Sequence, residues 1–106
     1  MASYGKLGNA ALTANTYTPV YSSASTGINM TTCNINMVNT GASNATVRLA
    51  ISTSTSPGAA DFIEYGVILE PGDVLERTAQ VLSPSEKVIC WADVAGVSVR
   101  VSGMAE

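Results

Sequence analysis

The chain has 106 residues, a formal net charge of −3 and only 12% charged residues, so it is long enough for one domain with a modest core. Its hydrophobic share of 46% is typical of a folded protein and argues against disorder. The five lysine and arginine residues are scattered, which argues against nucleic acid and anionic membranes as partners. We find no apolar run suited to a signal peptide or a membrane span, and therefore expect a soluble protein without an obvious export signal.

The N-terminal part of the chain shows the weakest pattern. Residues 1–12 contain Gly5 and Gly8 and are a candidate for an extended N-terminal arm. Residues 16–21, TYTPVY, predict the first strand. Because Pro19 has no N–H to donate to a neighbouring strand, we expect this strand at the edge of a sheet.

The middle of the chain alternates apolar and polar residues with the period of a β-strand. In residues 33–51, two alternating runs flank the turn-forming NTGASN, which predicts a hairpin with a loop of more than two residues. Residues 52–61 are rich in Ser, Thr, Gly and Pro and predict a loop. Residues 62–69 predict the next strand, with Ile63 and Tyr65 on one face.

The C-terminal part predicts three more strands. Residues 74–82 form one, and KVICW and VSVRV, joined by ADVAG, predict a second hairpin. Altogether, about eight short strands at intervals of about ten residues are typical of a sandwich or small barrel. We therefore predict an all-β protein, a single antiparallel β-sandwich or jelly-roll-like domain that covers residues 1–106.

Charge is concentrated in residues 70–88, EPGDVLERTAQVLSPSEKV. The EPGD and SPSE segments predict turns on either side of a strand. On that strand Glu76 and Arg77 are neighbours, so their side chains point to opposite faces. Acid–base catalysis needs two carboxylates that converge on a pocket, and nothing in a turn followed by a strand brings Glu70, Asp73 and Glu76 together. We interpret the stretch as turns and sheet rim, with a structural or intersubunit salt bridge through Arg77 as the alternative.

Other reaction chemistries lack their motifs. The sequence has no histidine, no GxSxG, no phosphate-binding loop and no calcium-loop spacing. Cys33 and Cys90 fit no zinc pattern; we interpret them as buried, inert side chains, with a cross-sheet disulfide as the alternative. We predict a protein that is not an enzyme, with no catalytic residue, no cofactor and no metal.

Sugar binding has one candidate platform. All-β modules often stack sugars on exposed aromatic rings, and YTPVY places Tyr17 and Tyr21 on one face of a strand, about 13 Å apart. Three other aromatic side chains, Phe62, Tyr65 and Trp91, are expected to help fill the core. Packing or a subunit contact is the competing interpretation of the two tyrosines.

The order of these segments resembles that of a known group of proteins. It is carried by YGKLGNAALTANTYTPVY, NINMVNTGASNATVRLAIS, IEYGVILEPGDVLERTAQVLSPSEKV and GVSVRVSGMAE, which together span nearly the whole chain. The third segment is the most specific. The pattern resembles small virion proteins of tailed bacteriophages, and Cys33, Cys90 and Trp91 depart from the polar or aliphatic residues usual there.

The resemblance implies a β-sandwich that coats or joins the virus particle, as head decoration (cement) proteins do, commonly as a homotrimer. The expected partners are the major capsid protein and further copies of the chain, and the expected location is the virion, assembled in the host cytoplasm. The alternative is a binding module of the tail, collar or fibre, with carbohydrate as its candidate ligand. Our candidate interface residues are Glu76, Arg77, Tyr17 and Tyr21.

Overall fold

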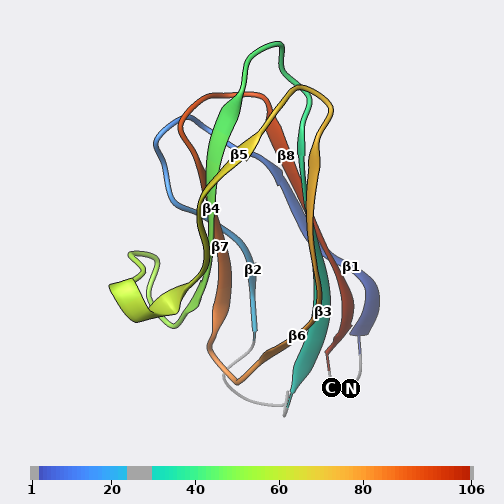
Figure 1. Ribbon diagram of the computed structural model, residues 1–106. Helices are drawn as coiled ribbons and strands as arrows, with labels where there is room; N and C mark the ends of the chain where they lie inside the picture. Colours follow the sequence, from blue (N-terminus) through green and yellow to red (C-terminus); the bar gives the residue numbers. More distant parts are fainter. Residues whose placement is uncertain (1–2, 24–29, 106) are drawn as a thin grey trace.

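The computed structural model describes residues 3–23 and 30–105, which form two four-stranded antiparallel sheets packed face to face (Figure 1). Sheet A has the strand order β1-β8-β3-β6 and sheet B the order β2-β7-β4-β5. The predicted all-β sandwich is confirmed. The elements are β1 (Ser3–Ala11), β2 (Thr18–Ser22), β3 (Thr31–Asn39), β4 (Ala45–Ser52), the 3-10 turn η1 (Ala59–Asp61), β5 (Phe62–Leu69), β6 (Val74–Leu82), β7 (Lys87–Ala92) and β8 (Val97–Ala105).

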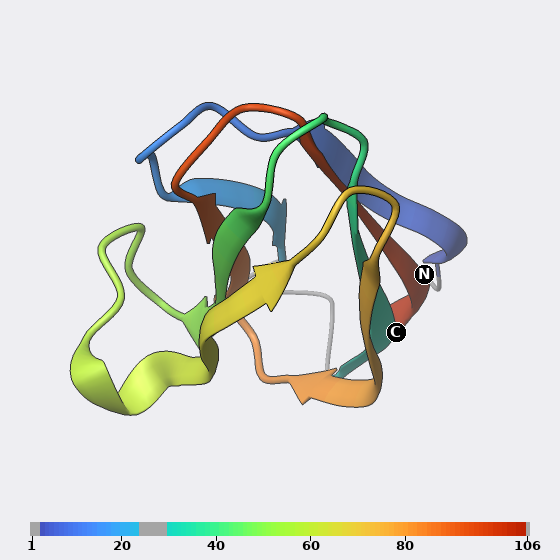
Figure 2. The same cartoon turned by 45° about the horizontal axis from the view of Figure 1, so that its top comes forward.

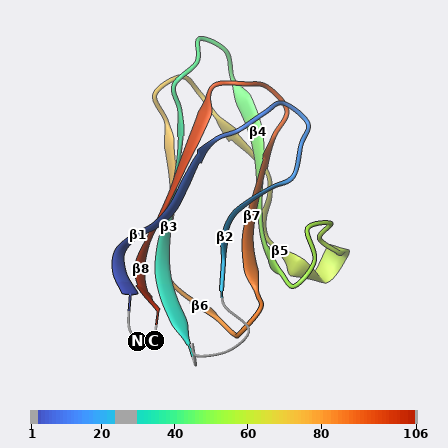
Figure 3. The ribbon, with the colours of Figure 1, turned by 180° about the vertical axis from the view of Figure 1, so that it is seen from behind.

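The strands pair in a nested order. In sheet A, β1 pairs with β8 and β3 pairs with β6, while in sheet B β2 pairs with β7 and β4 pairs with β5. The chain is therefore arranged like one long hairpin that has been rolled up, so that successive strand pairs alternate between the two sheets. This is the jelly-roll arrangement. Seen from behind, the start of β1 lies beside the end of β8 at one end of the sandwich (Figure 3).

Both predicted hairpins are wrong. β3 and β4 lie in different sheets, and so do β7 and β8, so the loops between them cross from one sheet to the other (Figure 2). The two crossing loops contact each other, because the backbone N–H and the hydroxyl of Thr40 both donate to the carbonyl oxygen of Gly96 at 2.7 Å. Alternation of apolar and polar residues shows which face of a strand is buried. The alternation pattern does not show whether the next strand pairs in the same sheet or lies in the opposite sheet.

The N-terminal residues belong to the sheet. Residues 3–11 form β1 and pair with β8 along their length, so the extended-arm interpretation is wrong for this part of residues 1–12. Pro19 lies on β2, which is an edge strand of sheet B. The prediction of an edge position from Pro19 is confirmed.

The core lies between the sheets and follows the predicted alternation. The inward residues of β3, β4, β7 and β8 are almost completely buried, as are Leu69 of β5 and Leu82 of β6, and β1, β2, β5 and β6 add partly buried side chains. The buried cluster consists of Leu12, Cys33, Ile35, Met37, Ala45, Val47, Leu49, Leu69, Leu82, Val88, Cys90, Ala92, Val97, Val99 and Val101.

Bulges in β5 overturn the expectation for its aromatic residues. Against β4, Tyr65 pairs with Arg48 and Val67 with Val47, which leaves Gly66 as the extra residue, at φ +78°. Glycine adopts this left-handed conformation without the clash that a Cβ would cause. Ile63 packs against the core whereas Tyr65 is 63% exposed, so the two do not share a face as predicted.

Phe62, Tyr65 and Trp91 lie outside the core cluster. Trp91 pairs with Arg48 on the neighbouring strand, between the inward-facing Cys90 and Ala92, and therefore points away from the core. The prediction that these three aromatic residues fill the core is wrong. Among the described residues, no helix is long and apolar enough to cross a membrane.

Candidate functional site

The charged stretch of residues 70–88 is a turn, a strand and a second turn, as predicted. In the first turn the Asp73 N–H donates to the Glu70 carbonyl oxygen at 2.9 Å, and Gly72 has φ +87°. The Glu70 N–H in return donates to the Asp73 carboxylate at 3.0 Å. The second turn has the same arrangement. The Glu86 N–H donates to the Ser83 carbonyl oxygen at 3.1 Å, and the Ser83 N–H donates to the Glu86 carboxylate at 2.7 Å. Asp73 and Glu86 therefore brace the two turns.

Glu76 and Arg77 point to opposite faces of sheet A, as predicted. Glu76 is exposed on the outer face and accepts a hydrogen bond from the Asn36 side-chain amide at 2.9 Å. Arg77 turns inward, and its Nε lies 2.6 Å from Oε2 of Glu64 on β5, although the N–H is not aligned for a hydrogen bond. Because β5 and β6 are edge strands of opposite sheets, this ion pair closes one side of the sandwich. The salt bridge expected of Arg77 is thus made within the chain.

The remaining described acidic residues also have structural contacts or lie alone. Asp61 accepts a hydrogen bond from the Gly58 N–H at 2.8 Å, and Asp93 accepts one from the Thr46 N–H at 2.8 Å. Within residues 3–23 and 30–105, no three His, Cys, Asp or Glu side chains are grouped to hold a metal ion. All of the described acidic residues except Glu70 therefore make a side-chain hydrogen bond or an ion pair within the chain.

Tyr17 and Tyr21 do not form a common platform. A register shift between Pro19 and Tyr21 in the pairing of β2 with β7 breaks the simple alternation, and Tyr21 packs against the core. Tyr17 lies on the outer face of sheet B, where its ring centroid is 6.2 Å from those of Phe62 and Trp91. The predicted shared face of the two tyrosines is wrong.

An aromatic cluster around Arg48 covers part of the outer face of sheet B. The guanidinium carbon lies 3.9 Å from the ring centroid of Trp91 and 4.5 Å from that of Tyr65. Nη1 of Arg48 donates a hydrogen bond to the Tyr17 hydroxyl at 2.8 Å. Sequence reasoning missed this Arg48 cluster because its members come from three strands and a loop, and no local pattern connects them.

The two cysteines are free and buried in the core, Cys33 on sheet A and Cys90 on sheet B. Burial raises the pKa of the Cys33 thiol from 9.0 to about 11 and the pKa of the Cys90 thiol from 9.0 to about 12. A thiolate is the reactive form of cysteine. The interpretation of both residues as buried, inert side chains agrees with this environment.

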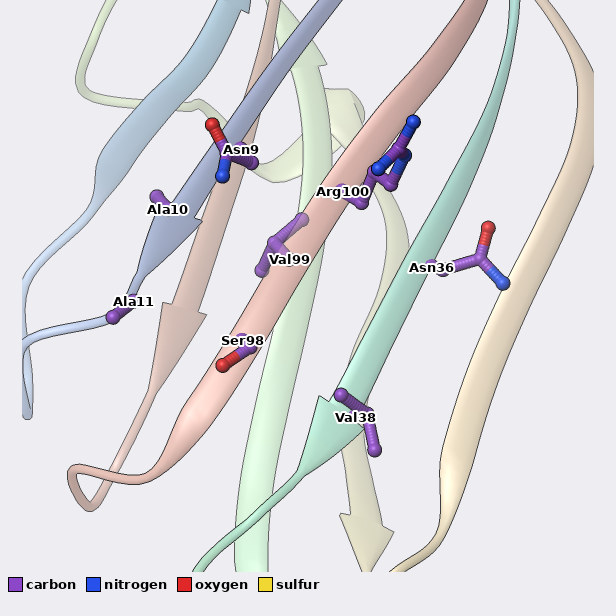
Figure 4. Close-up of a pocket in the computed structure, with 8 residues that line it drawn as sticks. All are labelled: Asn9, Ala10, Ala11, Asn36, Val38, Ser98, Val99 and Arg100. Carbon is purple, nitrogen blue, oxygen red and sulfur yellow. The ribbon is translucent and has the colours of Figure 1, made fainter. Parts of the chain in front are cut away.

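A shallow depression of about 340 Å³ lies on the outer face of sheet A (Figure 4). Across it, the strand register aligns Asn9 of β1, Arg100 of β8, Asn36 of β3 and Glu76 of β6 in one row. Figure 4 shows Arg100 between the two asparagines, with all three side chains on the same side of the sheet. We call these four residues the polar row. The depression is lined by Asn9, Ala10, Ala11, Asn36, Val38, Ser98, Val99 and Arg100.

Large apolar side chains are exposed on the outer faces of both sheets. On sheet A, Val81 and Met104 both pair with Thr32 and are 58% and 47% exposed, so they form one patch across three strands. On sheet B, Ile68 is 62% exposed and Tyr65 is 63% exposed, both on β5.

Comparisons with protein-family models, curated proteins and solved structures found no match.

Proposed function

We propose that the chain is a structural protein of a tailed-bacteriophage virion, a decoration (cement) protein that binds the assembled head and reinforces it. Its proposed partners are the major capsid protein and further copies of itself in a homotrimer, and its place is the virion, assembled in the host cytoplasm. The proposal starts from the resemblance of the four sequence segments to small virion proteins. It assigns the protein a binding role without catalysis.

The observation that carries the proposal is the exposure of large apolar side chains on opposite outer faces of a thin sandwich. The molecule measures 41 × 27 × 19 Å, and Val81 with Met104 on one sheet and Tyr65 with Ile68 on the other remain exposed. A cement protein must bury two surfaces at the same time, one against its own copies and one against the shell. Two apolar faces on one small domain suit that task.

The polar side chains support the same role. The described acidic residues other than Glu70 are hydrogen-bonded or ion-paired within the chain, so they supply rigidity. Low charge with many hydroxyl and amide groups suits wet contacts repeated over a large shell. The alternative, a tail, collar or fibre module that binds carbohydrate, loses its main support because Tyr17 and Tyr21 lie on different faces.

Binding to shells that lack the protein tests the proposal. Purified protein should bind such capsids in saturable amounts and raise the temperature at which they break open. Hundreds of copies per virion would support decoration of the shell. Three to a few tens of copies would support the tail, collar or fibre alternative. No binding to the capsids, together with unchanged heat stability, would contradict the decoration role.

A further inference from the structure

Arg100 differs from the other two arginines in its surroundings. Arg48 stacks on Trp91 and Tyr65 and bonds to Tyr17, and Arg77 pairs with Glu64. Arg100 lies on the inner strand β8 of sheet A and is exposed, and its side chain makes no hydrogen bond, ion pair or ring contact with any residue in the described ranges. Its guanidinium therefore keeps its five donors for an external group.

The neighbours of Arg100 add donors of the same kind. Asn9 and Asn36 flank it on the two adjacent strands (Figure 4), each about 4.8 Å away across the sheet. Asn36 uses one amide hydrogen for Glu76 and keeps a second, while the side chain of Asn9 has no hydrogen-bond partner among the described residues. The Ser98 hydroxyl also lines the depression. A guanidinium with flanking amide N–H groups is suited to the two oxygens of a carboxylate.

The one acidic residue of the polar row does not block this site. Glu76 lies two strands from Arg100, about 10 Å away across the sheet, and its carboxylate accepts a hydrogen bond from the side chain of Asn36, which lies between the two. At physiological salt the screening length is about 8 Å, so Glu76 repels an anion beside Arg100 only weakly.

We infer that the outer face of sheet A is a docking surface for a protein partner that inserts a glutamate or aspartate side chain into the depression, where Arg100, Asn9 and Asn36 bind its carboxylate. The other lining residues favour protein over acidic sugar. They are Ala10, Ala11, Val38, Ser98 and Val99, with no aromatic ring on which a sugar could stack.

The flanks of the depression match a protein interface as well. The patch of Val81 and Met104 lies toward one end of the same face, and Val74, 57% exposed, pairs with Val38 beside the depression. Protein interfaces are enriched in methionine and arginine within an apolar centre and have polar groups around it. This inference names the docking face and the partner's chemistry, and it holds whether or not that partner is a capsid protein.

The test is an NMR titration of the isolated protein with a blocked hexapeptide of alternating alanine and glutamate. We expect the side-chain N–H signals of Arg100, Asn9 and Asn36 to shift, and the same peptide with glutamine to leave them unchanged. Arg100→Gln should weaken binding of the glutamate peptide about tenfold or more, because it removes the charge-assisted bonds. The affinity of Arg100→Lys should lie between those of Arg100→Gln and the unaltered protein. Lys6→Gln, which removes one exposed positive charge from the neighbouring strand β1, is the matched control and should change the affinity less than twofold.

Three results would overturn the inference. These are shifts that do not centre on the three side chains, equal affinity of Arg100→Gln and the unaltered protein, and tighter binding of hexagalacturonate than of the glutamate peptide at the same residues. The last result would assign the site to an acidic sugar. Thermal unfolding of each variant verifies that the fold is intact. Since no capsid is present, failure here leaves the capsid-binding test of the proposed function unaffected.

Discussion

At the scale of single residues, the sequence predicts the direction of a side chain where the strand is regular, fails at bulges, and predicts the partner of a side chain poorly. In the alternating runs of β4 and β8, residues at every second position, such as Val47, Leu49 and Val99, are buried in the core. Alternation also placed Glu76 and Arg77 on opposite faces. The partners Asn36 and Glu64 were not predictable, because each lies on a strand whose pairing depends on the whole topology. The Arg48 cluster was hidden from sequence reasoning for the same reason.

Arg48 should contribute to stability through its charge. Arg48→Met keeps an apolar stem over Trp91 but loses the cation–π contacts and the bond to Tyr17, and we expect it to lower the free energy of unfolding by about 1–2 kcal/mol. Urea unfolding followed by the fluorescence of Trp91, the only tryptophan, measures this loss. Arg100→Met, also on an inner strand but without such contacts, is the control and should change stability by less than about 0.5 kcal/mol. Equal effects of the two substitutions would mean that the stacking contributes nothing.

The two thiols should make the fold sensitive to alkaline pH. Their pKa values in the folded protein, about 11 for Cys33 and about 12 for Cys90, lie above the ordinary value of 9.0. Above pH 9.0 the unfolded chain loses these protons while the folded protein keeps them, so the free energy of unfolding decreases as the pH rises toward 11. Below pH 9.0 the stabilisation is fully present.

Urea unfolding across this range measures the effect, with Cys90→Ala as the comparison. The variant should lose less stability than the unaltered protein between pH 9 and 11, even if its stability at neutral pH is lower because of the smaller core side chain. A thiol reagent should also modify neither cysteine of the folded protein at neutral pH. Rapid modification, or identical pH profiles, would contradict the buried environment of Cys90.

At the scale of elements, the sequence predicted most strands and misassigned their neighbours. Residues 62–69 and 74–82 are strands with the expected bounds, because alternation and flanking turns are local signals. Pairing is not local in a jelly roll: β1 pairs with β8, at opposite ends of the chain. A loop such as residues 40–44 has the length and composition of a hairpin loop, yet it crosses between sheets. Only the fit of all eight strands around one core decides between the two.

Asn39 holds that crossing loop in place. Asn39 is 1% exposed. Its side-chain N–H groups donate to the backbone carbonyl oxygens of Ser43 at 2.8 Å and of Leu69 at 2.9 Å. Its side-chain oxygen accepts a hydrogen bond from the Gly41 N–H at 2.9 Å. Asn39→Ala would leave buried backbone groups without partners, so we expect a loss of about 2–4 kcal/mol in the free energy of unfolding.

Asn34→Ala is the matched control for Asn39. Asn34 is exposed on the same strand, and its side chain accepts one hydrogen bond from the Ala79 N–H at 3.0 Å. Since water can replace this bond, the loss should be about 0.5–1 kcal/mol. Chemical denaturation of both variants decides the comparison. A cost for Asn39→Ala no larger than that for Asn34→Ala would show that the loop holds its position without the asparagine.

At the scale of the whole molecule, the sandwich presents two outer faces whose exposed apolar residues belong to different sheets. The sequence could indicate neither face, because exposure depends on which strands are inner and which are edges. Val81 is on sheet A and Ile68 on sheet B, so each can be altered without touching the other face. If the proposed function is right, the two faces serve different contacts, one with further copies of the chain and one with the shell.

Val81→Ser and Ile68→Ser separate these contacts. Both side chains are more than half exposed, so each variant should keep its stability within about 0.5 kcal/mol. Burying one such side chain at an interface contributes about 1.5–3 kcal/mol, so each substitution should weaken its own contact about tenfold or more. Light scattering would show one variant falling from about three times the 10.9 kDa chain mass toward a single chain. The other variant would remain trimeric and fail to bind capsids.

Thr55→Ala, in the exposed loop of residues 52–61, is the control that should change neither property. Unchanged mass and unchanged capsid binding in both serine variants would rule out the two-faced arrangement on which the cement proposal depends.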